Sequence, residues 1–317
     1  AAQQVETEWT RERGAARDNH PDPRLATPLT RNSADPRGPF YRSLGQEDCY
    51  ERLKLAVKRG RGLAVVIGDA GYGKTTIKQA LLHEFRPDPG VAIGTVDDPR
   101  DCRTDVQFLR AVLGQFGVDA SGRTGLDLTT EFLGYLETMR AARRMALLVI
   151  DEGQRLTGSQ LEILRTFLSG EGPARSPIVI AIFAEPELEE KIGRKRNLAQ
   201  RVGMEHRLNP LNRRDTAGLI AHRLAAAGHP AGNGRPPFTE EAIDLIHERS
   251  GGVPRAIVEI SAGCVQEASR RHRDQVDGAL ATEAIDRRAA RNGAASGQVM
   301  QIRMELPSGF AGAEAAP

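Results

Sequence analysis

The chain has 317 residues, of which 39% are hydrophobic, and its 44 basic and 42 acidic residues nearly cancel. This length is enough for one substantial core and a smaller second domain. Because the charges balance, nothing in the overall composition demands a nucleic acid or a membrane as partner, and any such affinity has to be local.

Cysteines, histidines and apolar segments narrow the class of protein further. Cys49, Cys102 and Cys264 lie far apart, and the seven histidines never join them at ligand spacing, so we expect a reducing compartment and no structural zinc. No apolar stretch approaches the ~20 residues that cross a bilayer, and the N-terminal region carries charges where a signal peptide needs an apolar segment. We therefore expect a cytoplasmic protein without a membrane partner.

The first segment, residues 1–38, mixes polar residues with almost no periodic apolar positions. Such a composition cannot bury enough surface to offset the entropy of ordering, so we expect a flexible N-terminal arm. From residue 39 the pattern changes, and apolar positions predict a helix over residues 47–58.

An apolar run at residues 63–67 predicts a buried strand, and a glycine-rich segment follows it directly. The segment consists of Gly68, Asp69, Ala70, Gly71, Tyr72, Gly73, Lys74 and Thr75. It is a complete G-x-x-x-x-G-K-[ST] phosphate loop, in which glycines let backbone N–H groups point at a polyphosphate and a helix N-terminus adds its dipole. The pattern predicts a nucleotide site with Lys74 at the β and γ phosphates, Thr75 as a Mg²⁺ ligand and Thr76 as a further contact.

Beyond the phosphate loop, strands and helices continue to alternate. Apolar patterns predict a short strand at residues 91–96 and helices at residues 106–116 and 126–143. A complete strand–helix unit thus precedes the next apolar run, at residues 145–150. This order predicts an extra strand between the two nucleotide strands and fits a simple kinase fold less well.

Asp151 and Glu152 follow the strand at residues 145–150, and ligands of open α/β sheets bind at such carboxyl ends. Asp151 suits a direct or water-mediated contact with Mg²⁺, because a hard cation prefers oxygen ligands. Glu152 suits the general base that polarises the attacking water. The alternative is that the two carboxylates only cap the strand and start a turn at Gly153, which would leave the phosphate loop without a metal ligand.

The rest of the chain moves from strands to helices. Later patterns predict strands at residues 178–183 and 205–208, and helices at residues 213–227, 240–248 with Thr239 as N-cap, 254 onward and 282–291. By composition the chain divides into an arm (1–38), an α/β nucleotide-binding domain (39–211), a helical lid domain (212–292) and a C-terminal tail (293–317).

Several spaced motifs together resemble one family. They are Pro39–Phe40 before a helix, Gly68–Thr76, Leu148–Leu156, Leu161–Arg165, Pro186–Leu188, Leu198–Val202 and Ser250–Arg255. In this order they resemble the AAA+ ATPases, and more narrowly the branch that contains ExeA-type secretion ATPases and MuB- and TnsC-type transposition ATPases. The resemblance implies a three-layer AAA+ P-loop α/β sandwich, with a parallel five-stranded sheet in the order 5-1-4-3-2, and a small all-α lid domain.

The same resemblance implies roles for two arginines. In the family, the arginine of the Leu-x-Gln-Arg segment reaches the nucleotide of a neighbouring subunit, so Arg201 is the candidate finger that neutralises transition-state charge. The arginine of the Gly-Gly-x-Pro-Arg segment contacts phosphate from the lid, which nominates Arg255. These roles imply a homo-oligomer, either a ring or a helical filament. The alternative for each arginine is a solvated surface charge.

Ala184–Glu185 departs from the family pattern, which has Gly-Gln before Pro-Glu-Leu. A neutral amide at this position orients the attacking water, whereas a carboxylate near the γ phosphate is repelled unless it is protonated or paired with a cation. We therefore expect Glu185 either to slow hydrolysis or to turn toward a basic neighbour.

A basic run at residues 191–214 bears on possible partners. It holds Lys191, Arg194, Lys195, Arg196, Arg201, Arg207, Arg213 and Arg214 against Glu205 alone. Such clusters attract phosphate backbones through counterion release, and an ATP-assembled oligomer would repeat the cluster along a duplex. Because no aromatic residues interleave, we expect sequence-independent binding of double-stranded DNA, with Arg194, Lys195 and Arg196 as the candidate contacts. The alternative is that the run serves a subunit interface and solubility.

Three functions follow, in this order of preference. The first is a DNA-associated regulator of the transposition type, which assembles with ATP on duplex DNA and recruits or activates partners such as a transposase. The second is an ExeA-like secretion ATPase, although that family's usual transmembrane and cell-wall-binding portions do not follow the lid. The third is an ATP-binding switch with slow turnover, which Glu185 favours.

Overall fold

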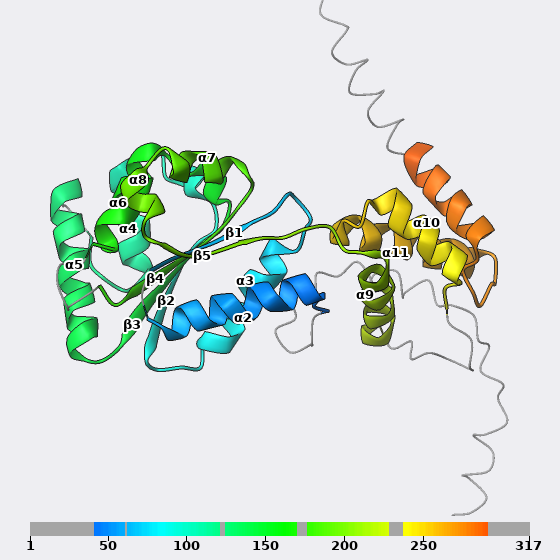
Figure 1. The fold of residues 1–317 in the computed structure, drawn as a ribbon, viewed down its shortest axis with the longest axis horizontal. Helices are drawn as coiled ribbons and strands as arrows, with labels where there is room; N and C mark the ends of the chain where they lie inside the picture. Colours follow the sequence, from blue (N-terminus) through cyan, green and yellow to red (C-terminus); the bar gives the residue numbers. More distant parts are fainter. Residues whose placement is uncertain (1–40, 61, 121–123, 170–175, 228–236, 291–317) are drawn as a thin grey trace, which may run out of the picture.

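The computed structural model of the protein describes residues 41–60, 62–120, 124–169, 176–227 and 237–290. The arm expected at residues 1–38 and the tail expected at residues 293–317 lie outside these residues. Figure 1 shows an α/β part and a separate, wholly helical part, joined by the chain that leaves the fifth strand.

A parallel five-stranded sheet forms the centre of the α/β part (Figure 1). Its strands are β1 (Gly62–Ile67), β2 (Val91–Val96), β3 (Met145–Ile150), β4 (Ile178–Ala184) and β5 (Val202–Arg207). Their order across the sheet is β2-β3-β4-β1-β5, which is the order that the family resemblance implies, read from the other edge. The strand that separates the two nucleotide strands β1 and β3 is β4, and β2 lies at an edge.

Helices cover both faces of this sheet (Figure 1). They are α2 (Leu44–Lys58) and α3 (Lys74–Phe85) on one face, and α4 (Asp105–Gln115), α5 (Gly125–Ala141), α6 (Gly158–Phe167), α7 (Glu187–Gly193) and α8 (Arg196–Ala199) on the other. Alternate strand residues therefore enter two cores: Val66 packs in the α2–α3 core, and Ile67 packs in the opposite one. Because both faces are covered, β4 is buried at every residue and reads as a continuous apolar run.

Capping residues explain where several of these helices begin. Four of them begin with a capping box, in which the side chain of the capping residue accepts a hydrogen bond from the backbone N–H three residues later. The side chain of that later residue accepts a hydrogen bond from the backbone N–H of the capping residue. The capping residues are Ser43, Thr104, Thr124 and Thr157. Such a box stabilises a helix start by about 1 kcal/mol. The box at Ser43 starts α2 three residues before the helix predicted from apolar spacing.

The helical part has a core of its own, built from residues such as Leu219, Ile246 and Ile257. Its helices are α9 (Arg213–Ala226), α10 (Glu240–Ser250), α11 (Pro254–Arg270) and a further helix over residues 278–290. This last helix begins four residues before the predicted one. Within the described ranges, no helix combines the length and the apolar character that a membrane span requires.

Candidate active site

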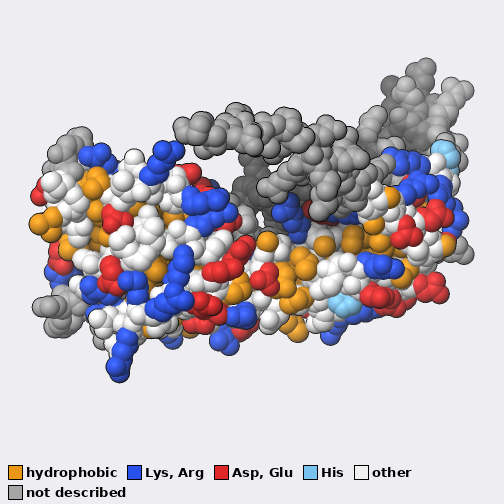
Figure 2. Space-filling model, turned by 90° about the horizontal axis from the view of Figure 1, so that it is seen from above, with side chains coloured by type: hydrophobic (Ala, Val, Ile, Leu, Met, Phe, Trp, Pro, Cys, Tyr) orange, Lys and Arg blue, Asp and Glu red, His pale blue; other side chains and the backbone are white. Residues whose placement is uncertain are grey.

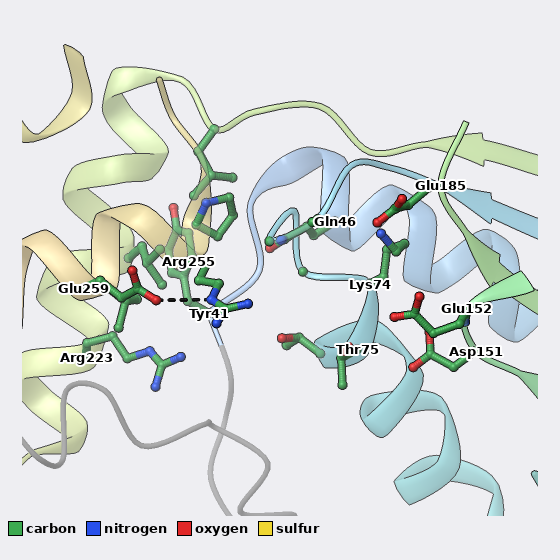
Figure 3. Close-up of a pocket in the computed structure, with 18 residues that line it drawn as sticks. Tyr41, Gln46, Lys74, Thr75, Asp151, Glu152, Glu185, Arg223, Arg255 and Glu259 are labelled. Carbon is green, nitrogen blue, oxygen red and sulfur yellow. Dashed lines mark hydrogen bonds and ion pairs between the residues drawn. The ribbon is translucent and has the colours of Figure 1, made fainter. Parts of the chain in front are cut away.

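A cavity of about 660 Å³ lies between the α/β part and the helical part. Figure 3 shows Lys74, Thr75, Asp151, Glu152 and Glu185 on one side of it. The other predicted site residues that line it are Ala70, Gly71, Gly73, Thr76 and Arg255. Of the predicted catalytic and cofactor residues, Gly68, Asp69, Tyr72 and Arg201 are not among those that line the cavity.

The phosphate loop connects β1 to α3 with a backbone that only glycine adopts easily at two points. Gly71 and Gly73 have φ values of 87° and 96°, in the left-handed region. A Cβ at Gly73 would also lie 2.6 Å from Nε2 of Gln46, which donates a hydrogen bond to the carbonyl of Tyr72 at 3.3 Å. Gln46, near the start of α2, therefore supports the loop and also lines the cavity, although it belongs to no part of the phosphate-loop motif.

Lys74 is buried at the first turn of α3, and carbonyl oxygens hold its ammonium group. Its Nζ donates hydrogen bonds to the backbone oxygens of Gly68 at 2.5 Å and Asp69 at 3.1 Å. Neither partner is a carboxylate, so no ion pair with another part of the described chain offsets the charge of Lys74. The group thus supplies positive charge to the wall of the cavity.

Asp151, at the end of β3, is buried, and both of its carboxylate oxygens have partners. Its Oδ1 accepts a hydrogen bond from the backbone N–H of Glu152 at 3.0 Å, and its Oδ2 lies 2.7 Å from Nζ of Lys78. Lys78 also lies 3.0 Å from Oδ1 of Asp97, which follows β2. Burial by itself would lower the pKa of Lys78, but the hydrogen bonds and charges of Asp151 and Asp97 raise it above its usual value.

Lys78 belongs to none of the sequence motifs, although its spacing from Thr75 could have indicated it. It lies three residues after Thr75 on α3, so both side chains share one face of the helix. The pairing itself depends on β2 and β3 being neighbours in the sheet, since this adjacency brings Asp97 and Asp151 to the same edge.

The donors in the cavity fit a Mg²⁺ ion that also binds a nucleotide. The Thr75 hydroxyl and the Asp151 carboxylate line the same space, and both are oxygen ligands of the kind Mg²⁺ prefers. The described residues include no group of three or more His, Cys, Asp or Glu side chains able to hold a metal ion. We therefore expect phosphate oxygens to complete any such site.

Glu152 adopts a left-handed backbone conformation, with φ 52° and ψ 36°, which few residues other than glycine adopt. Its Oε2 accepts a hydrogen bond from Nε2 of Gln154 at 2.8 Å and lies 3.2 Å from the guanidinium of Arg155. Arg155 in turn forms an ion pair with Asp98. These contacts hold the Glu152 carboxylate at the cavity wall, at the start of the 3-10 turn η3 (Gly153–Arg155).

Glu185, just after β4, lines the cavity, and its backbone N–H donates to Oε1 of Gln154 at 3.1 Å. No basic side chain in the described ranges lies within ion-pair distance of its carboxylate. Among the described residues, Glu185 therefore has no basic neighbour of the kind that the sequence analysis expects.

The helical part contributes its own residues to the cavity (Figure 3). The backbone N–H of Arg255, at the start of α11, donates to the carbonyl of Gly71 at 3.3 Å, and its side chain bonds to Glu259 at 3.1 Å. Arg223 of α9 also lines the cavity, and burial lowers its pKa. Glu259 and Arg223 belong to no motif that the sequence displays.

Tyr41 links the chain before α2 to the helical part, and it too lines the cavity. Its hydroxyl donates to Oδ1 of Asp215 at 3.0 Å, and a Cβ at Gly218 would lie 2.4 Å from that hydroxyl oxygen. Burial, together with the hydrogen bond and charge of Asp215, raises the pKa of Tyr41 to about 12. Gly218 of α9 thus leaves space for the Tyr41 ring, which the sequence patterns did not identify as part of the site.

Acidic neighbours partly offset the basic run at residues 191–214. Arg194 pairs with Glu190 at 3.2 Å, and Lys195 pairs with Glu162 at 2.8 Å. In Figure 2 basic and acidic side chains are interspersed over the α/β part. Arg196 and Arg201 are exposed, and neither has a side-chain partner in the described part of the chain. The composition of the run does not reveal these two ion pairs, because Glu190 and Glu162 lie outside it.

Residues 57–192 match a family model described as "AAA domain". The matched range contains the phosphate loop, Lys78 and the Asp151–Glu152 pair, and it ends before the helical part. The parallel sheet and its flanking helices have the AAA+ P-loop arrangement.

Among curated proteins, General secretion pathway protein A of Aeromonas hydrophila is 28% identical over 221 residues, which cover 69% of this chain and 39% of that protein. An uncharacterized HTH-type transcriptional regulator of Methanocaldococcus jannaschii is 24% identical over 168 residues, 51% of this chain and 39% of that protein. The chain thus spans only 39% of the length of these curated relatives.

Several solved structures have a fold similar to that of this chain. The ORC2 protein of Aeropyrum pernix, in ADPNP and ADP complexes, has a TM-score of 0.61 at 16% identity and covers 81% of this chain and 71% of that one. The RuvB Holliday junction branch migration motor of Thermotoga maritima has a TM-score of 0.53 at 16% identity, covering 76% and 69%. The Drosophila ORC bound to DNA has a TM-score of 0.59 at 16% identity, covering 82% and 64%. At these identities the similarity shows the fold alone.

Proposed function

We propose that this chain, whose residues 57–192 match the AAA domain, binds ATP with Mg²⁺ and hydrolyses it to ADP and phosphate. One observation carries the proposal: a single cavity brings together Lys74, Thr75, Asp151 and Glu152. These side chains offer a cation, a hydroxyl and two carboxylates, which are the groups that phosphoryl transfer to water uses.

Each side chain has a distinct role in this proposal. Lys74 and the N–H groups of the phosphate loop bind the phosphates, and Arg255 reaches them from α11. Thr75 and Asp151 hold Mg²⁺, which when bound neutralises charge on the phosphate oxygens. Glu152 accepts the proton of the attacking water, because its carboxylate is anchored at the cavity wall and faces the same space.

A Glu152→Gln variant tests the catalytic assignment. We expect turnover of ATP to fall by about 10²–10⁴-fold, since general acid–base groups contribute that much, while ATP binding stays intact. Phosphate release and calorimetry measure the two quantities. The exposed Glu137, which pairs with Arg140 on α5, provides the matched control Glu137→Gln. Unchanged turnover in Glu152→Gln would remove Glu152 from the mechanism.

We further propose that ATP drives the chain into a homo-oligomer on double-stranded DNA, where it recruits a partner such as a transposase. Exposed Arg196, which has no acidic partner in the described chain, supports the DNA role, and the Drosophila ORC structure of similar fold is bound to DNA. Arg194 and Lys195 contribute less, because Glu190 and Glu162 offset their charge. The DNA contact is sequence-independent, since it rests on charge alone.

The competing function is a role in secretion, favoured by the 28% identity to General secretion pathway protein A. Electron microscopy and ATP turnover with duplex DNA separate the two. The DNA role predicts ordered assemblies that need both DNA and a non-hydrolysable ATP analogue, and a DNA stimulation of turnover that falls steeply with salt. Assembly and turnover that ignore DNA would favour the secretion role.

A further inference from the structure

Lys78 is a buried cation whose only charged partners in the described chain are two aspartates. Its side chain is 7% exposed, and so is screened little by water, whereas the side chain of Asp97 is 80% exposed. The Asp151 partner is 11% exposed and lies at the closer distance, 2.7 Å. The stronger pairing is therefore with the residue that the proposed function assigns to Mg²⁺.

The pairing places two cations in competition for one carboxylate. Oδ2 of Asp151 faces the Lys78 ammonium, and Oδ1 already accepts the N–H of Glu152, so neither oxygen is without a partner. A divalent ion that takes Asp151 must either displace the ammonium or share the carboxylate with it. In both cases the nearby positive charge makes the ion bind less tightly, because like charges repel strongly where water is scarce.

We infer that Lys78 is a positioning residue that holds Asp151 and competes with Mg²⁺ for it, and so sets the Mg²⁺ concentration at which nucleotide binds. The inference rests on the proposed function, since it needs a nucleotide with its metal in the cavity. Lys78 does not line that cavity, and acts only through Asp151. Asp97 weakens this competition, because it also pairs with the Lys78 ammonium and neutralises part of its charge.

A purely structural ion pair would behave differently. The pair between Lys54 and Glu84, at 2.8 Å, also joins a helix lysine to a carboxylate, and neither residue lines the cavity. Removing Lys54 leaves the charge near Asp151 unchanged. Lys54→Met is therefore the matched control for Lys78→Met.

The test is a MgCl₂ titration of the full chain with a fluorescent, non-hydrolysable ATP analogue, followed by anisotropy. We expect Lys78→Met to lower the half-saturating Mg²⁺ concentration by about tenfold, the lower end of the effect that a neighbouring charge has on proton binding by a carboxylate. Lys78→Arg, which keeps the charge, should stay near the unsubstituted value, and so should Lys54→Met. Asp97→Asn should shift the requirement the opposite way, because Lys78 then serves Asp151 alone.

Two results would overturn the inference: an unchanged or higher Mg²⁺ requirement in Lys78→Met, or a lower one in Asp97→Asn. If Lys78→Met does not fold, the exposed Asp97 still gives a decisive variant, since its substitution leaves the buried pair in place. Analogue binding that shows the same Mg²⁺ dependence in every variant would sink the inference and spare the proposed function. A failure of the unsubstituted chain to bind the analogue at any Mg²⁺ concentration would overturn both.

Discussion

Individual residues at the edge of the sheet carry unusual constraints. Glu152 has a left-handed backbone, which costs about 1–2 kcal/mol for a residue with a side chain. Gly153 follows, and a Cβ there would lie 2.2 Å from Cγ2 of Ile182 on β4. The chain therefore turns sharply against β4 immediately after the strand, and this turn brings the Glu152 carboxylate to the cavity.

Gly153→Ala tests whether that close approach matters. We expect it to lower the free energy of unfolding by about 1–3 kcal/mol, because an added methyl group has no room beside Ile182. Urea denaturation measures the change. Gly193→Ala, at the end of α7, is the control, because apart from adjacent residues and the helix's own backbone no atom lies within 4 Å of the added Cβ. Equal stabilities for the two variants would contradict the packing argument.

Glu185→Gln tests the departure from the family pattern. Glu185 adds negative charge to a cavity proposed for a triphosphate, and no described basic side chain is within ion-pair distance of it. We expect the variant to bind ATP more tightly and to hydrolyse it faster, each by about fivefold, since a charge near the phosphates is worth about 1 kcal/mol in a well-solvated site. Calorimetry and phosphate release give the two values.

The exposed Glu187, two residues on and outside the cavity, provides the control Glu187→Gln. In Glu185→Gln the gain in affinity should be smaller for ADP than for ATP, because Glu185 is expected to repel the γ phosphate. Equal changes for both nucleotides, or for both variants, would count against this role of Glu185.

At the scale of whole elements, ion pairs join the helices of the helical part. Glu267 of α11 is buried and lies 2.8 Å from Nε of Arg271 and 2.6 Å from Arg287, which comes from the helix over residues 278–290. Burial alone would raise the pKa of Glu267, but the hydrogen bond from Arg271 and the charges of Arg287, Arg271 and Arg270 lower it below its usual 4.5.

This pKa shift predicts a pH-dependent stability. A carboxyl with a lowered folded pKa stabilises the protein above its ordinary pKa, and that contribution disappears as pH falls through the lowered value. We expect Glu267→Gln to cost about 2 kcal/mol of unfolding free energy at pH 7 and progressively less below pH 4.5. Urea denaturation across this range checks it. A pH-independent difference would show that the loss is one of packing rather than charge.

Most of the fold could be predicted from the sequence where a pattern had sharp limits. The strand at residues 145–150 was located to the residue, because charged Arg144 and Asp151 bound an unbroken apolar run. The helices α6, α7 and α8 were not predicted, and α7 and α8 are too short to show a periodic apolar stripe. Contacts between segments far apart in the chain could not be predicted: the pairs Lys78–Asp151 and Lys195–Glu162 depend on how the chain folds in three dimensions.

At the scale of the molecule, the cavity is formed by two parts of the chain, and the proposed oligomer would add a third component. Arg201 is exposed, lies just before β5 and is absent from the cavity of its own chain. This position leaves its guanidinium available to a neighbouring subunit, as the family resemblance implies.

Mixing variants tests that arrangement. We expect Arg201→Ala to bind ATP normally but to lose at least about a hundredfold in turnover, since arginine fingers are worth that and more. A mixture of Arg201→Ala with Glu152→Gln should regain activity, because an intact active site then meets an intact finger across an interface. A mixture as inactive as its components would contradict a role for Arg201 in trans.

The central claim is that the phosphate loop and the Asp151–Glu152 pair together bind ATP with Mg²⁺. Isothermal titration of the folded chain with a non-hydrolysable ATP analogue and Mg²⁺ tests it most directly, with Lys74→Ala alongside. We predict saturable binding of one nucleotide per chain, weakened at least about tenfold in Lys74→Ala, because a charged hydrogen bond to phosphate is lost. No binding by the folded, unsubstituted chain, or equal binding by Lys74→Ala, would contradict the account.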